Sequence, residues 1–173
     1  MERITLTKLK KYLSGRPSSE LINEISELFK TFPEVRDYYE SRLISDGNDR
    51  LLSQCKESVE KEFFPANGLG AGRLSVPRKA IAEFKKVSSS AKHVIDLILF
   101  SVEMAIEYTS TFGDMNETYY RGIERLYGRA LELIYKGNLQ EEYSSRCRKI
   151  VKSTIDFAWG FNDNMREIHY HYF

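Results

Sequence analysis

Apolar residues recur at helical spacing along most of the chain. Leu21, Ile25, Leu28 and Phe32, for example, follow one another at intervals of four, three and four residues. This spacing places all four on one face of an α-helix. Nowhere does a run bounded by turn residues alternate strictly between apolar and polar positions, as a half-buried strand would. The pattern therefore predicts an all-α protein.

Turn and capping residues divide this pattern into about seven or eight helices. We expect them close to residues 6–13, 18–32, 33–46, 52–63, 75–87, 91–112, 116–136 and 139–172. In the last of these, one apolar stripe runs from Tyr143 to Tyr172 and passes Gly160 without changing register. The stripe predicts a long C-terminal helix, which is either continuous or kinked at that glycine.

The length of 173 residues fits one domain, an irregular helical bundle over residues 1–173. A glycine-rich loop at 66–74 divides it into possible halves, 1–65 and 75–173. Residues 94–106 form the most apolar stretch, and their apolar side chains surround the expected helix. We therefore place this helix at the centre of the fold. The stretch is too short and too charged to span a membrane.

The loop sequence NGLGAGRL, residues 67–74, has three alternate glycines. Nucleotide-binding glycine loops follow a strand and lead into a helix, whereas a helix ending at a proline is expected here. We therefore interpret the loop as a flexible crossing between the two halves. The alternative is an anion-binding site at the next helix start, formed by Arg73, Arg78 and Lys79.

Acidic and histidine residues gather near the C-terminus. Asp163, Glu167 and His171 are spaced four residues apart and share one helical face. With Glu103 and Glu107 from another helix they could hold a metal, which would make the protein a metal-binding bundle or a hydrolase. Paired Glu-x-x-His motifs and H-E-x-x-H are missing from the sequence. The alternative is a solvated acidic edge, and no cofactor is predicted.

The two cysteines, Cys55 and Cys147, lie on apolar stripes of expected helices. This position predicts reduced, buried thiols rather than catalytic nucleophiles. The first residues contain no apolar segment typical of a secretion signal. These features favour a cytoplasmic protein. The sequence also contains no G-x-S-x-G motif, and we therefore favour a protein that is not an enzyme.

Charge does not favour nucleic-acid binding, because 26 basic residues face 25 acidic ones and the net charge is +1. Basic residues do cluster at 8–11, 78–86 and 146–149. Each cluster alternates with apolar positions and is first of all a solvated helix face. A nucleic-acid-binding helical domain stays an alternative if the fold brings these clusters together.

Aromatic residues are abundant, with 11 tyrosines beside the single Trp159. Such residues often provide adhesive surface for a partner, although they also serve as ordinary core. We predict a partner surface at Trp159, Tyr170 and Phe173. The expected function is a non-enzymatic protein-interaction or scaffold module, with a protein partner or self-association and no membrane contact.

Several blocks together resemble a bacterial family of uncharacterised proteins of similar length, a domain of unknown function. The blocks are residues 9–13 (LKKYL), 32–43 (FPEVRDYYESRL), 60–65 (EKEFFP), 80–86 (AIAEFKK), 107–120 (EYTSTFGDMNETYY) and 159–173 (WGFNDNMREIHYHYF). The resemblance implies a bacterial, cytoplasmic, stand-alone helical domain. It implies no activity, cofactor or active-site residue.

Overall fold

The computed structural model describes residues 3–173, which form nine helices and no strand. The helices are α1 (Leu6–Ser14), α2 (Ser18–Thr31), α3 (Pro33–Leu43), α4 (Gly47–Phe63), α5 (Ser75–Val87), α6 (Ala91–Phe112), α7 (Glu117–Lys136), α8 (Gln140–Lys152) and α9 (Phe161–Tyr172). The all-α prediction is confirmed. The expected number of helices, seven or eight, is slightly too low.

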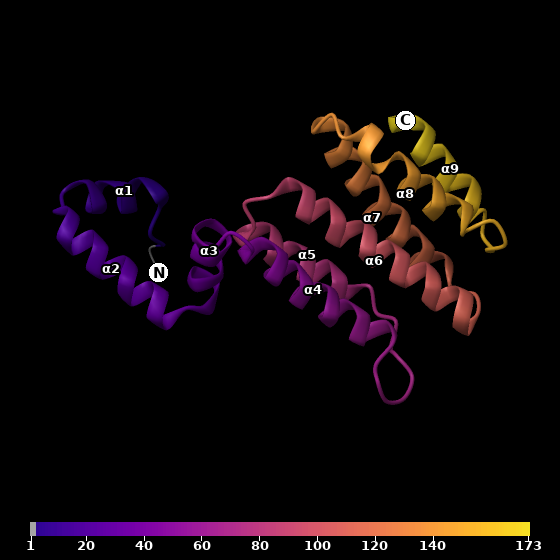
Figure 1. Cartoon of the computed structure of the whole chain (residues 1–173), viewed down its shortest axis with the longest axis horizontal. Coiled ribbons are helices and arrows are strands. Elements are labelled where there is room, and N and C mark those ends of the chain that lie inside the picture. The colour runs from indigo at the N-terminus through magenta and orange to yellow at the C-terminus, as the bar shows by residue number, and fades with distance from the viewer. Residues whose placement is uncertain (1–2) are drawn as a thin grey trace.

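The additional helix arises because the predicted long C-terminal helix is two helices. α8 ends at Lys152, and α9 begins at Phe161 after a turn in which Trp159 and Gly160 have φ angles of 63° and 65°. This left-handed pair reverses the chain, so that α9 packs beside α8 (Figure 1). The apolar spacing continues across the turn because both helices bury their stripes in the same core. Periodicity alone therefore could not show the break.

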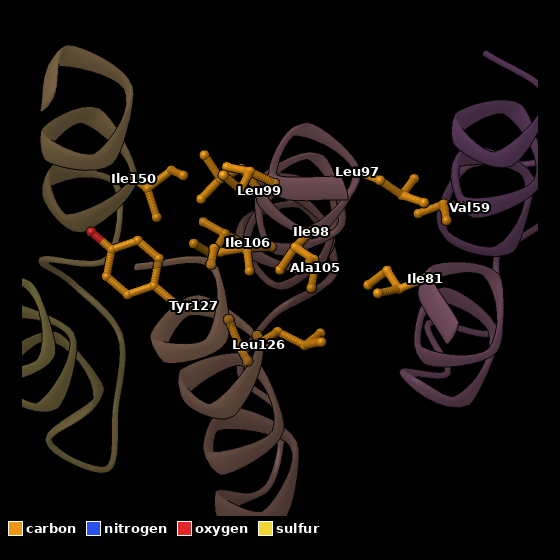
Figure 2. Close-up of a cluster of buried hydrophobic side chains, with 14 of the residues drawn as sticks. Val59, Ile81, Leu97, Ile98, Leu99, Ala105, Ile106, Leu126, Tyr127 and Ile150 are labelled. Carbon is orange, nitrogen blue, oxygen red and sulfur yellow. The ribbon is translucent and has the colours of Figure 1, made fainter. Parts of the chain in front are cut away.

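α6 lies at the centre of the fold, as predicted from the apolar side chains that surround the helix on all sides. α4 and α5 pack on one side of it and α7 on the other, while α8 and α9 form an outer layer with α7 (Figure 1). Figure 2 shows side chains of α6 pointing to both sides, Leu97 toward Val59 of α4 and Ile106 toward Tyr127 of α7. Within residues 3–173, no helix is long and apolar enough to cross a membrane.

The core is one continuous cluster that includes residues from both sides of the glycine-rich loop. Val59 and Phe63 of α4 are fully buried together with Ile98 of α6 and Leu131 of α7. Each such side chain contributes about 1.5–3 kcal/mol of hydrophobic free energy when it leaves water. Packing of this kind holds α4 to α9 together.

Local capping fixes where the central helices begin. The side chain of Ser90 accepts a hydrogen bond from the backbone N–H of His93 at the start of α6, and Asn116 does the same for Tyr119 at the start of α7. Serine and asparagine are favoured at these positions, because their side chains satisfy backbone donors that a helix start leaves free.

α3 is attached to this body by hydrogen bonds at the end of α5. The Ser41 hydroxyl donates to the Val87 carbonyl at 2.7 Å, and the Arg42 guanidinium donates to the same oxygen at 2.7 Å. The amide of Asn48 donates to the Ser41 carbonyl at 2.9 Å. α3 therefore links the packed body to α1 and α2.

Candidate interaction surface

α1 and α2 extend from one end of the molecule and contribute nothing to its core (Figure 1). Every residue of these two helices is at least partly exposed. Their apolar side chains nevertheless follow regular helical stripes. We call the exposed members the N-terminal apolar face: Leu6, Leu9, Tyr12, Ile22, Ile25, Leu28, Phe29 and Phe32.

The exposure of this face is large for side chains of its type. Leu6 and Ile22 have 66% and 62% of their surface accessible. In α4 to α9, by contrast, the corresponding stripe positions are buried. Contiguous exposed apolar surface marks interaction sites on soluble proteins, because exposing it to water is unfavourable.

One end of the N-terminal apolar face is anchored to the rest of the molecule. The ring of Phe29 lies 6.4 Å from that of Tyr39 on α3, and the Arg36 guanidinium lies 5.8 Å from the Phe29 ring centre. α2 packs on α3, and a short turn joins α1 to α2. The face is thus presented on a projecting hairpin.

The two helices of the hairpin carry opposite charge. α1 has three lysines, Lys8, Lys10 and Lys11, and no acidic residue, whereas α2 has three glutamates and one lysine. In the turn, Arg16 pairs with Glu20 at 3.2 Å. The Oε2 atom of Glu24 is buried without a hydrogen-bond partner and lies 4.0 Å from Arg16 Nη1. The face is therefore flanked by a basic edge and an acidic edge.

The predicted anion-binding residues are engaged differently from the expectation. Arg73 forms a two-pronged ion pair with Glu62, with Nε–Oε1 at 2.9 Å and Nη2–Oε2 at 3.1 Å. This hydrogen-bonded pairing lowers the pKa of Glu62 and raises that of Arg73. Lys79 lies 3.8 Å from Glu83 on its own helix. Arg73 is therefore already satisfied by a carboxylate, and the Arg78 guanidinium lies against Gly122 of α7.

The backbone of the glycine-rich loop also has internal partners. The N–H groups of Ala71 and Gly72 both donate to the carbonyl of Glu62, and the Tyr108 hydroxyl donates to the carbonyl of Gly70 at 2.9 Å. A Cβ on Gly70 would lie 1.9 Å from the Phe63 carbonyl oxygen, so the chain passes there too closely for a side chain. The loop closes the C-terminal end of α4, and the expectation of a merely flexible crossing is corrected.

The structure does not assemble the predicted metal site. Asp163, Glu167 and His171 are exposed on α9, and Glu167 and His171 border a surface hollow with Gly128 of α7. Within residues 3–173, no three histidine, cysteine, aspartate or glutamate side chains form a group that could hold a metal ion. Glu103 is not available to them, because both of its carboxylate oxygens accept hydrogen bonds from Arg146.

That arginine is the centre of an ion-pair cluster joining three helices. Arg146 of α8 pairs with Glu103 and Asp96 of α6, and Asp96 also accepts a hydrogen bond from Lys56 of α4 at 2.6 Å. Burial opposes these charges, but the hydrogen bonds outweigh it, lowering the pKa of Asp96 and raising that of Arg146. The cluster orients α8 on the core, and both of its carboxylates are engaged by cations.

Neither cysteine has the environment of a nucleophile. Both are free thiols; Cys147 is buried and Cys55 is half-buried. Burial raises the pKa of Cys55, and it raises the pKa of Cys147 to about 11. The reactive thiolate is therefore scarce at neutral pH.

The predicted aromatic surface and the basic clusters are only partly gathered. Trp159, Tyr170 and Phe173 are all exposed near the C-terminus, at the opposite end of the molecule from α1 and α2. Phe173 also stacks on the His169 ring at 4.7 Å. The three basic clusters lie on α1, α5 and α8, with α1 far from α8 (Figure 1), so they do not form one groove.

The N-terminal apolar face itself was not recognised as a site from the sequence. Its leucines and isoleucines have the same spacing as those of the core helices, so this spacing predicts helices and does not distinguish a covered face from an exposed one. The signal in the sequence is the number of apolar residues in α1 and α2, which exceeds the number of apolar residues in the neighbouring α3.

Fold and surface together define an all-helical, single-core protein with a projecting amphipathic hairpin. The sequence profile of a family of unknown function, DUF6155, matches residues 4–172. The chain therefore belongs to this family, which confirms the resemblance to a domain of unknown function. No curated protein and no solved structure matches the chain.

Proposed function

We propose that the protein is a non-enzymatic interaction module that self-associates through the α1–α2 hairpin. In the proposed dimer, the N-terminal apolar faces of two copies pack together as a bundle of four helices. The observation that carries this proposal is the regular apolar stripe on two helices that bury no residue of their own.

The apolar area supports an interface rather than scattered exposure. The eight large side chains of the face, each between 39% and 66% exposed, lie on two consecutive helices and the residue that ends the second. Side chains of this size at about half exposure present several hundred Å², whereas a standard interface buries about 800 Å² per partner. The face therefore supplies a large share of what a stable dimer requires.

The charge distribution favours a second copy over an unrelated protein. Two-fold symmetry brings the same surface of each copy together. When two hairpins pair antiparallel, the basic α1 of one copy crosses the acidic α2 of the other, and the reverse contact forms at the same time. The hairpin is thus complementary to itself, and the lysines of α1 in one copy would face the glutamates of α2 in the other.

A cytoplasmic setting is part of this proposal. It is supported by the two cysteines, which remain unpaired thiols in the folded chain.

Sedimentation or light scattering over a range of protein concentrations tests the self-association. The unaltered chain is expected to shift from monomer to dimer as concentration rises. Ile22→Glu places a charge in the middle of the face and should keep the protein monomeric. Leu69→Glu is the matched control, because Leu69 is 81% exposed but lies in the glycine-rich loop. That variant should dimerise like the unaltered chain.

A charge exchange tests the pairing itself. Lys10→Glu with Lys11→Glu should weaken the dimer through repulsion by α2 of the second copy. Adding Glu24→Lys and Glu27→Lys to the same chain should restore it, because both edges are then inverted. A protein that stays monomeric at every concentration contradicts the proposal, as does equal loss of the dimer in the Leu69→Glu control.

A further inference from the structure

A second feature, independent of the hairpin, lies between α8 and α9. A surface cavity of about 310 Å³ opens there, within the size range of small-molecule sites. Arg148, Lys152 and Ile155 line it from the α8 side, and Arg166, His169 and Tyr170 line it from α9. None of the residues lining the cavity is acidic.

The three cations of this cavity lack carboxylate partners. Within residues 3–173, no ion pair involves Arg148, Lys152 or Arg166, although their neighbour Arg146 has two. The acidic residues of α9 do not line the cavity, and Glu167 borders a different hollow. Three like charges around one cavity repel one another, and a bound anion would relieve that repulsion.

The walls of the cavity are held in place by hydrogen bonds that are buried or partly buried. The amide of Asn162 donates to the Val151 carbonyl at 3.1 Å and to the Thr154 hydroxyl at 2.9 Å, which ties α9 to the end of α8. The His169 Nδ1 atom lies 3.1 Å from the Tyr127 hydroxyl of α7. The cavity is thus formed before any ligand arrives, which reduces the ordering cost of binding.

His169 supplies a neutral polar group to the cavity. Burial, and secondarily the charge of Arg148, lower the pKa of His169 below its ordinary value of 6.5. The Tyr127 hydroxyl donates to the Cys147 carbonyl at 3.2 Å. Its oxygen can then accept from the Nδ1–H of His169, which fixes the orientation of the neutral ring in the cavity wall.

We propose that this cavity binds a phosphate monoester with a small apolar body. Arg148, Lys152 and Arg166 would hold the phosphate, since guanidinium groups match its oxygens and carry the required charge. Val151, Ile155 and the ring of Tyr170 form the apolar wall against which the body of the ligand packs.

Calorimetric titration of the full chain with phenyl phosphate tests this site. Inorganic phosphate, phenol and phenylacetate serve as comparison probes. Phenyl phosphate is expected to bind at least about tenfold more tightly than each of them, because only it offers both a dianion and an apolar ring. Tighter binding of phenylacetate would overturn the assignment to phosphate, and undetectable binding of phenyl phosphate would overturn the site.

Charge-neutral variants locate the binding. Arg148→Gln and Arg166→Gln should each weaken phenyl phosphate binding by about tenfold. Lys149→Gln is the matched control, because Lys149 lies on α8 but lines a different hollow. This variant should bind phenyl phosphate with unchanged affinity. Equal weakening by the control would show general attraction to positive charge and contradict the site. In NMR spectra the ligand should shift the ring signals of His169 and leave those of His93 on α6 unmoved.

Discussion

The hairpin of α1 and α2 and the body formed by α4 to α9 are built from the same kind of sequence but end in opposite environments. Leu28 of α2 and Leu99 of α6 both occupy helical apolar stripes, yet Leu28 is 42% exposed and Leu99 is fully buried. In the body, each stripe faces another helix of the chain. In the hairpin it faces solvent. The comparison teaches that an amphipathic sequence determines which face of a helix favours burial. It does not determine which other surface covers that face.

The strongest test of this comparison is one substitution made in both regions. Leu99→Ala should lower the free energy of unfolding by about 2–5 kcal/mol, because it leaves a cavity in a packed core. Leu28→Ala should lower it by less than about 1 kcal/mol when the protein is monomeric. Urea denaturation at low protein concentration measures both. Equal losses would show that the hairpin is packed as tightly as the body.

Protein concentration sharpens the same test. If the hairpin pairs with a second copy, the cost of Leu28→Ala should grow as concentration rises, because dimerisation stabilises the folded state. The cost of Leu99→Ala should not follow concentration in this way.

A smaller effect is expected from a methyl group added at a glycine of each region. Gly70→Ala should cost about 1–3 kcal/mol, because the new Cβ would collide with the Phe63 carbonyl and force the backbone to shift. Gly15→Ala, between α1 and α2, meets nothing closer than 3.9 Å at negative φ. It should be neutral or slightly stabilising, because alanine restricts the unfolded chain. Thermal melting of both variants measures the difference, and a neutral Gly70→Ala would show that the loop is not held against α4.

The smallest effect concerns pH and belongs to the body alone, because α1 and α2 contain no histidine. Burial lowers the pKa of His169 in the folded protein below the unfolded value of 6.5. Between these two values the unfolded chain binds more protons, so stability rises with pH. The contribution is complete above about pH 6.5 and is lost as pH falls through the folded pKa.

Replacing this histidine should therefore flatten the pH dependence. His169→Gln should show a smaller drop in urea midpoint between about pH 7.5 and pH 5.5 than the unaltered chain. His171→Gln is the control, because His171 is exposed two residues away on α9. Its pH dependence should match that of the unaltered chain; a flattened curve in this control would assign the effect to the wrong histidine.

Local chemistry in the sequence determined the helical class, most helix boundaries and the central position of α6. These follow from interactions within a few residues, namely side-chain spacing and the first free N–H groups of a helix. Tertiary structure decided the rest. The chain reverses at Trp159 and Gly160, within the apolar stripe near the C-terminus. Arg73 and Glu103 form ion pairs with distant residues, and the apolar faces of α1 and α2 stay exposed. Those outcomes depend on which distant side chain lies opposite, and the spacing of residues along one helix carries no record of that neighbour.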